Sequence, residues 1–97
     1  MLKDKPRQLE LMRSMLDRFS EASASLAKTE QDYKTFPDDD QLALQWDSAY
    51  RRYDDALQAA ARQMVLVCES SMTIQAARTM LVKDLDKARQ VVTKLSA

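Results

Sequence analysis

The fold of this 97-residue chain is decided by residues 43–95, which read ALQWDSAYRRYDDALQAAARQMVLVCESSMTIQAARTMLVKDLDKARQVVTKL. When the stretch is divided into heptads, two positions of each heptad carry apolar side chains, with Ser71 and Arg78 as the polar exceptions. The first position holds Ala43, Tyr50, Leu57, Met64, Ser71, Arg78, Leu85 and Val92, and the second holds Trp46, Tyr53, Ala60, Val67, Ile74, Leu81, Ala88 and Leu95. Residues three and four apart share one face of an α-helix, so the stretch predicts a helix whose apolar seam another helix must cover.

The composition favours an all-α fold. The chain contains no Gly and no Asn, which are the residues best suited to the left-handed backbone of tight β-hairpin turns. Ala, Leu, Gln, Met, Arg and Lys are common, and these are good helix formers. We therefore expect residues 1–97 to form a single helical domain.

A first helix is predicted over residues 5–35. Asp4 can cap its N-terminus, and Pro6 is tolerated in the first turn because the N–H that proline lacks has no partner there. Its own heptad seam holds Leu2, Leu9, Leu16 and Ser23 at one position and Met12, Phe19, Leu26 and Tyr33 at the other. This seam is expected to pack on the seam of residues 43–95.

A bend is predicted over residues 36–39. Pro37 disfavours helical geometry at Phe36 and ends the first helix, and Asp38 can cap the next one with Gln41 completing a capping box. So short a connection between two helices predicts an antiparallel hairpin.

Two architectures compete beyond the bend. In the first, a long helix runs over residues 40–95, extends past the first helix and pairs in a homodimer. In the second, the helix breaks near residues 69–72, with a turn at Ser70 and Ser71, and the chain closes a compact three-helix bundle. We favour the long helix, because the heptad phase passes through Ser71 unbroken and no Gly or Asn terminates a helix there.

The second half of the long seam is the predicted partner surface. Its anchors pack on an amphipathic helix of another protein, on a second copy, or on both. The predicted interface residues are Val67, Ile74, Arg78, Leu81, Leu85, Val92 and Leu95. Arg78 either fixes the register by pairing with an acidic group such as Glu69 or Asp84 of another chain, or extends its charge to solvent.

No residue pattern points to catalysis, a cofactor or a metal. The chain has no His to act as a base, and no Gly-rich loop to hold a phosphate. Cys68, the single cysteine, has Glu69 as its charged neighbour and is expected to act as a small apolar residue. The run Asp38, Asp39 and Asp40 lacks the alternate spacing of a calcium loop and fits helix capping instead. We therefore expect a protein that is not an enzyme.

The charge pattern leaves one alternative function open. Fifteen basic and fifteen acidic side chains cancel overall, but residues 21–40 sum to −4 and residues 71–97 to +3. Arg51 and Arg52 flank an aromatic stripe of Trp46, Tyr50 and Tyr53, and arginines beside stacking rings can bind single-stranded nucleic acid. The alternative is therefore a nucleic-acid-binding accessory protein that uses Arg51, Arg52 and the basic C-terminal segment. Aromatic residues at seam positions are more often core, so nucleic acid is the less favoured partner.

A cytoplasmic location is expected. The single cysteine cannot form an internal disulfide, and the start of the chain lacks the apolar core of a signal peptide. The longest unbroken apolar run, residues 64–68, is far too short to cross a membrane. Export by a route without a cleaved signal would leave no trace in these patterns.

In size and in the expected hairpin shape, the chain is similar to the short helical-hairpin proteins of bacterial secretion systems. One group of these is secreted hairpins with a Trp-x-Gly bend, and Trp46-Asp47-Ser48 departs from that motif by lacking the glycine. The other group is small helical chaperones that hold the helices of another subunit. This resemblance implies an adaptor or chaperone-like assembly protein.

Overall fold

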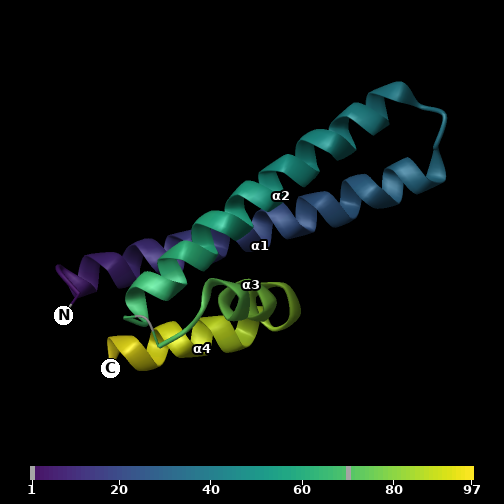
Figure 1. Cartoon of the computed structure of the whole chain (residues 1–97). Coiled ribbons are helices and arrows are strands. Elements are labelled where there is room, and N and C mark those ends of the chain that lie inside the picture. Colours follow the sequence, from purple (N-terminus) through teal and green to yellow (C-terminus); the bar gives the residue numbers. More distant parts are fainter. Residues whose placement is uncertain (1, 70) are drawn as a thin grey trace.

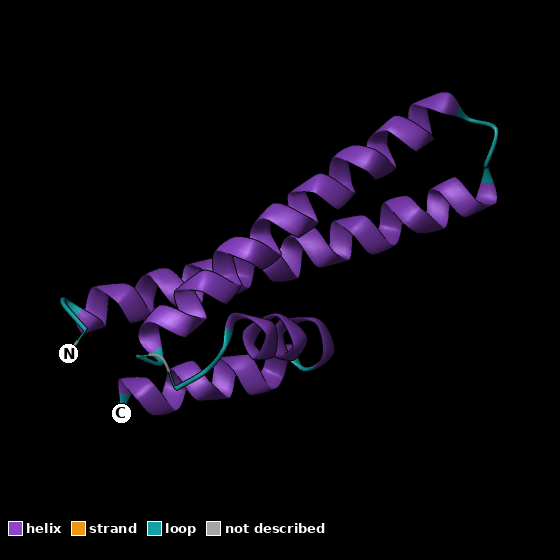
Figure 2. Ribbon diagram, in the orientation of Figure 1, coloured by secondary structure: helices purple, strands orange, loops and turns teal. Residues whose placement is uncertain are grey.

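The computed structural model describes residues 2–69 and 71–97 and confirms an all-α fold. Four helices follow one another along the chain, and the part that the structure describes contains no strand (Figures 1 and 2). They are α1 (Lys5–Thr35), α2 (Asp40–Val67), α3 (Ile74–Lys83) and α4 (Leu85–Ser96).

The first two helices run side by side in opposite directions and meet at the bend after Thr35 (Figure 1). The bend differs from the prediction in its cap, because Asp39 rather than Asp38 caps α2. The Oδ1 atom of Asp39 accepts hydrogen bonds from the backbone N–H groups of Gln41, at 2.9 Å, and Leu42, at 3.3 Å. Asp4 stands at the N-cap position of α1, but its backbone is left-handed and its side chain makes no capping bond.

The favoured prediction of one long helix over residues 40–95 is wrong. The chain leaves α2 after Val67, and the segment that follows folds back along the hairpin. Part of the predicted turn, Ser70, lies outside the described residues. The compact three-helix alternative is closer to the structure, but its third helix is divided at Asp84 into α3 and α4. The Asp84 side chain caps α4 by accepting a hydrogen bond from the N–H of Lys87.

The turn between α2 and α3 forms without glycine. Glu69 takes a left-handed backbone with φ of 51°, a conformation that costs a non-glycine residue about 1–2 kcal/mol. The Ser71 hydroxyl donates to the carbonyl oxygen of Cys68, and the Thr73 hydroxyl caps α3 by accepting from the N–H of Ala76. Side chains therefore satisfy backbone groups that the helix ends leave free.

Folding back gives the apolar seam its cover within one chain. One core joins all four helices and is made of buried Leu9, Met12, Leu16, Phe19, Leu57, Ala60, Ala61, Met64, Val67, Ala77, Leu81, Ala88 and Val92. In a single straight helix of an isolated chain, the last four of these side chains would lie beyond α1 and face solvent. Their burial is the physical reason why the chain turns where the local sequence gives only a weak signal.

The result is a rod with extents of 52 × 20 × 20 Å. The α3–α4 segment (residues 71–97) lies against one half of the α1–α2 hairpin, and the other half extends past it (Figure 1). Across the described residues, no helix is both long enough and apolar enough to span a membrane.

Candidate partner-binding surface

The most distinctive surface is the free half of the hairpin, which we call the arm (residues 20–54). The buried residues of the shared core end at Phe19 on α1 and begin at Leu57 on α2. Ala49 is the one residue of the arm that is buried. Two helices without a third therefore form the arm, and they leave much of its apolar surface open.

A row of aromatic rings in tilted or edge-on contact runs from the core into the arm. Centroids are 5.2 Å apart for Phe19 and Tyr53, 6.4 Å for Tyr53 and Tyr50, 5.7 Å for Tyr50 and Trp46, and 6.2 Å for Trp46 and Tyr33. These spacings are typical of favourable aromatic pairs. The rings support one another, so this aromatic ladder presents a preformed surface.

Exposure of the ladder is greatest at Tyr50, because the rings on either side of it, Tyr53 and Trp46, are partly buried. Phe19 is 2% exposed, whereas Tyr50 is 50% exposed, and Phe36 at the bend, outside the ladder, is 61% exposed. Burial, followed by the neighbouring Tyr50 and Asp54, raises the pKa of the Tyr53 phenol above its ordinary value of 10.0. Tyr53 therefore remains a neutral hydroxyl at physiological pH.

Tyr50 lies on the same face of α2 as residues that α3 covers further from the bend. Tyr50, Leu57 and Met64 are spaced by seven residues and share one face of α2. Leu57 lines a groove with Arg78 and Val82 of α3, so α3 lies over that face. Two turns closer to the bend the same face carries Tyr50, which is 50% exposed and lies beyond the part of the face that α3 covers.

The arm is also acidic. Residues 20–54 carry eight acidic and four basic side chains, a net charge of −4. Glu21, Asp32 and Asp38 are exposed. The arm thus combines half-exposed aromatic rings with a negative field, which favours a cationic partner.

The predicted interface residues lie on the α3–α4 segment and at the end of α2, and most of them pack within the chain. Val67, Leu81 and Val92 are buried in the core, and Leu85 and Leu95 pack against it while partly buried. The intramolecular core alone accounts for the apolar character of these five. Contact between any of them and a partner remains a prediction.

The other two predicted residues reach the surface. Ile74 is 47% exposed at the start of α3, and Arg78 is half-buried. Arg78 lines the groove beside Leu57 with Gln75, Thr79, Val82 and Lys83. Sequence reasoning did not single out Val82, which is 54% exposed, because it lies outside the heptad seam.

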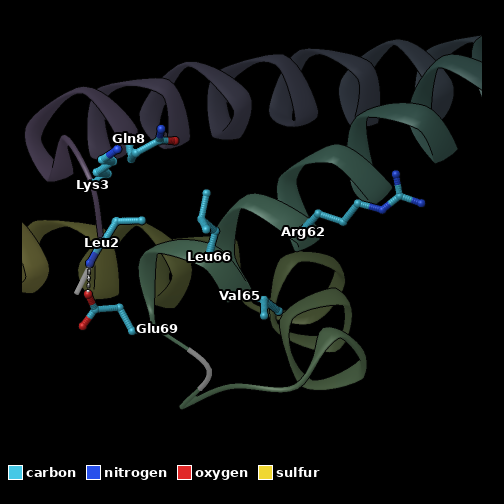
Figure 3. Close-up of a pocket in the computed structure, with 7 residues that line it drawn as sticks. All are labelled: Leu2, Lys3, Gln8, Arg62, Val65, Leu66 and Glu69. Carbon is cyan, nitrogen blue, oxygen red and sulfur yellow. Dashed lines mark hydrogen bonds between the residues drawn. The ribbon is translucent and has the colours of Figure 1, made fainter.

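A second surface feature is a wide, shallow groove of about 770 Å³ at the opposite end of the hairpin from the bend (Figure 3). Leu2, Lys3, Gln8, Arg62, Val65, Leu66 and Glu69 line it. The Leu2 N–H donates to Glu69 Oε1 at 2.6 Å across the groove. Its polar groups are a lysine, a glutamine, an arginine and a glutamate, which do not pair a nucleophile with a base.

Cys68 and the acidic residues give no sign of redox or metal chemistry. Burial raises the pKa of the Cys68 thiol above its ordinary value of 9.0, which disfavours the reactive thiolate. Among residues 2–69 and 71–97, no group of three or more His, Cys, Asp or Glu side chains is placed to hold a metal ion.

The two arginines of the nucleic-acid alternative lie in an acidic setting. Arg51 pairs with Asp47 at 3.2 Å, and Arg52 lines a surface depression with Arg18 and Glu21. The surrounding arm has a net charge of −4, which opposes the approach of a polyanion. Nucleic-acid binding stays a prediction that this setting does not favour.

Comparison with protein families, with curated proteins and with solved structures finds no match for this chain.

Proposed function

We propose that this chain is a non-enzymatic interaction module that binds a helix of a protein partner along its arm. The observation that carries the proposal is Tyr50, a half-exposed aromatic residue at the seam position that α3 covers elsewhere on α2. The α1–α2 hairpin already accepts helices on this face in its other half. In the arm, α3 and α4 do not cover this face, so it is open to a helix of a partner.

The aromatic ladder supports a role in binding. Tyr and Trp supply a large contact area and lose little conformational entropy when they are held by neighbours before binding. Tyr50 lies between Trp46 and Tyr53, with its ring tilted against both at centroid distances of 5.7 and 6.4 Å. A partner that covers Tyr50 therefore buries a ring that is already oriented.

The chemistry of the arm defines the kind of partner. A helix with apolar residues at three- and four-residue spacing fits beside two antiparallel helices. The net charge of −4 on residues 20–54 favours basic side chains at the edges of that helix. We infer a basic amphipathic helix, and an adaptor or chaperone-like role in assembling helical subunits.

The test is site-specific photo-crosslinking from the arm in cells that express the chain natively. A benzophenone amino acid is placed at Tyr50 and, as the matched control, at Leu66, which is 45% exposed on the same helix near the opposite end. We expect a discrete protein adduct from position 50 and none of the same mass from position 66. Equal labelling from both positions, or none from position 50, contradicts the proposal.

A second measurement uses the partner identified in this way. We expect Tyr50→Asp to weaken its affinity by at least about tenfold, because a charge would replace a buried ring, whereas Leu66→Asp leaves it unchanged. Circular dichroism of both variants checks that the helices are intact.

A further inference from the structure

Charge is segregated along the rod. The arm carries −4, whereas the α3–α4 segment carries five basic and two acidic side chains, a net charge of +3. Lys83, Lys87 and Lys94 of this segment are exposed. Arg89 is bound to Asp17 of α1, with Nη1 and Oδ1 2.9 Å apart. The chain therefore carries, at its other end, a helical segment whose charge is opposite to that of the arm.

The lengths of the two parts match. At 1.5 Å per residue, α3 is about 15 Å long and α4 about 18 Å, whereas residues 20–35 of α1 extend about 24 Å beyond the core. The open length of the arm is thus sufficient to seat one further α3–α4 segment. The segment of the same chain cannot reach it, because its core residues hold it on the other half of the hairpin.

Each of the two parts also offers exposed apolar side chains. Tyr50 on the arm is half-exposed on the face of α2 that carries α3. On α3, Ile74 and Val82 are 47% and 54% exposed. Pairing the arm with an α3–α4 segment would bring apolar groups together inside a frame of opposite charges.

We propose that the occupant of the arm is the α3–α4 segment of a second copy, in an antiparallel dimer with two-fold symmetry. Each copy covers the arm of the other, so both arms are covered and the assembly stops at two chains. This inference rests on the proposed function, since it names the partner of the same surface. It differs from a dimer held by the seam at residues 67–95, because the apolar seam residues other than Ile74 are buried or partly buried within each chain.

The test measures mass by sedimentation equilibrium on the full chain and three variants. The arm variant is Glu21→Lys, Asp32→Lys and Asp38→Lys, which takes the arm from −4 to +2. The segment variant is Lys83→Glu, Lys87→Glu and Lys94→Glu, which takes the α3–α4 segment from +3 to −3. The control variant is Lys3→Glu, Arg7→Glu and Arg62→Glu, which removes the same charge outside the segment.

We expect the unaltered chain and the control variant to have twice the 11.1 kDa mass of one chain at low salt. The arm variant and the segment variant, each alone, should dissociate at least about tenfold more readily, because like charges then meet at both contacts. Mixed in equal amounts, the two should form a heterodimer, because each contact again joins opposite charges. Circular dichroism checks the fold of each variant, and recovery on mixing cannot come from misfolded chains.

Two results overturn the inference. One is an unaltered chain that stays monomeric across the concentration range at low salt. The other is a dimer that persists in both charge variants and gains nothing from their mixing, which would place the interface elsewhere. In either case the proposed function is judged separately, by whether a benzophenone at Tyr50 crosslinks to a different protein.

Discussion

The side chain of Gln63 on α2 donates two hydrogen bonds from Nε2 to Gln8 on α1, at 3.0 Å to the backbone oxygen and 2.8 Å to Oε1. Gln63 is the one buried polar residue among those that the structure describes. Hydrogen bonds at a single polar site inside an apolar interface fix the register of two helices, because any slip leaves the buried amide unpaired. This pair sets how far α2 runs along α1, and thereby how much of the hairpin remains as the arm.

Replacing Gln63 by Ala should lower the free energy of unfolding by about 1–2 kcal/mol, because both hydrogen bonds and part of the packing are lost. Urea denaturation followed by circular dichroism measures the change. Gln45→Ala, at an exposed position of the same helix, is the control and should have almost no effect. Equal stability of the Gln63→Ala variant and the unaltered chain would contradict a structural role for this pair.

The fold predicts very different effects at two adjacent residues of α3. Leu81 is 1% exposed in the core and Val82 is 54% exposed. Leu81→Ala should lower the free energy of unfolding by about 2–4 kcal/mol through the cavity it leaves. Val82→Ala should change it by less than about 0.5 kcal/mol when measured at low concentration. A long straight helix would expose both side chains of a monomer, and similar small effects at both positions would argue for that form.

Glu69 gives a test that depends on the sign of the effect. In the observed turn Glu69 has a φ of 51°, a conformation that glycine adopts more readily. Glu69→Gly should therefore raise the free energy of unfolding by about 0.5–1 kcal/mol. This value allows for the loss of the hydrogen bond from the Leu2 N–H to the Glu69 side chain. If α2 instead ran on through this position, the same substitution would lower stability by about 1 kcal/mol. Thermal or urea unfolding distinguishes the two directions. Glu69→Val should destabilise the observed turn, because a β-branched residue tolerates positive φ poorly.

Stability should fall at alkaline pH. Burial raises the pKa of Cys68 above 9.0, and burial with its neighbours raises that of Tyr53 above 10.0. Between the unfolded and folded pKa values the folded chain holds more protons than the unfolded chain, so the free energy of unfolding decreases as pH rises through 9 and then 10. Denaturation at a series of pH values should show both steps.

Cys68→Ser and Tyr53→Phe separate the two contributions. The first should remove the step near pH 9 and leave the one above pH 10, and the second should do the reverse. Thiol modification provides an independent check, because Cys68 should react more slowly at pH 8 in the folded chain than in urea. A stability that stays constant from pH 8 to pH 11 would show that neither pKa is shifted by folding.

The local elements were predictable because their signals are strong and close together in the sequence. Pro37 ends α1 at Thr35, and α2 follows from Asp40. The cap was placed one residue too early, since three consecutive aspartates offer nearly equal capping groups. Asp84 is the first acidic residue after the predicted turn, but its role as the cap of α4 depends on the break that the chain makes there.

The candidate surface was only partly predictable. The aromatic stripe of Trp46, Tyr50 and Tyr53 was visible in the sequence, and seam position argued for its burial. The structure buries Tyr53 in part and leaves Tyr50 half-exposed, because the α3–α4 segment is too short to reach it. No pattern in the sequence predicted that Val82 is exposed, since the exposure of one apolar side chain depends on which helices pack beside it.

By itself the sequence determined that the chain is helical, that it bends after residue 35 and that residues 43–95 carry a seam in need of cover. A heptad specifies a face to be buried, but it does not specify whether the covering helix belongs to the same chain or to another. Only the tertiary structure decided that α1 and the returning α3–α4 segment supply the cover. The reason is that burying Ala77, Leu81, Ala88 and Val92 in one core outweighs the cost of a left-handed Glu69, a balance that no local pattern records.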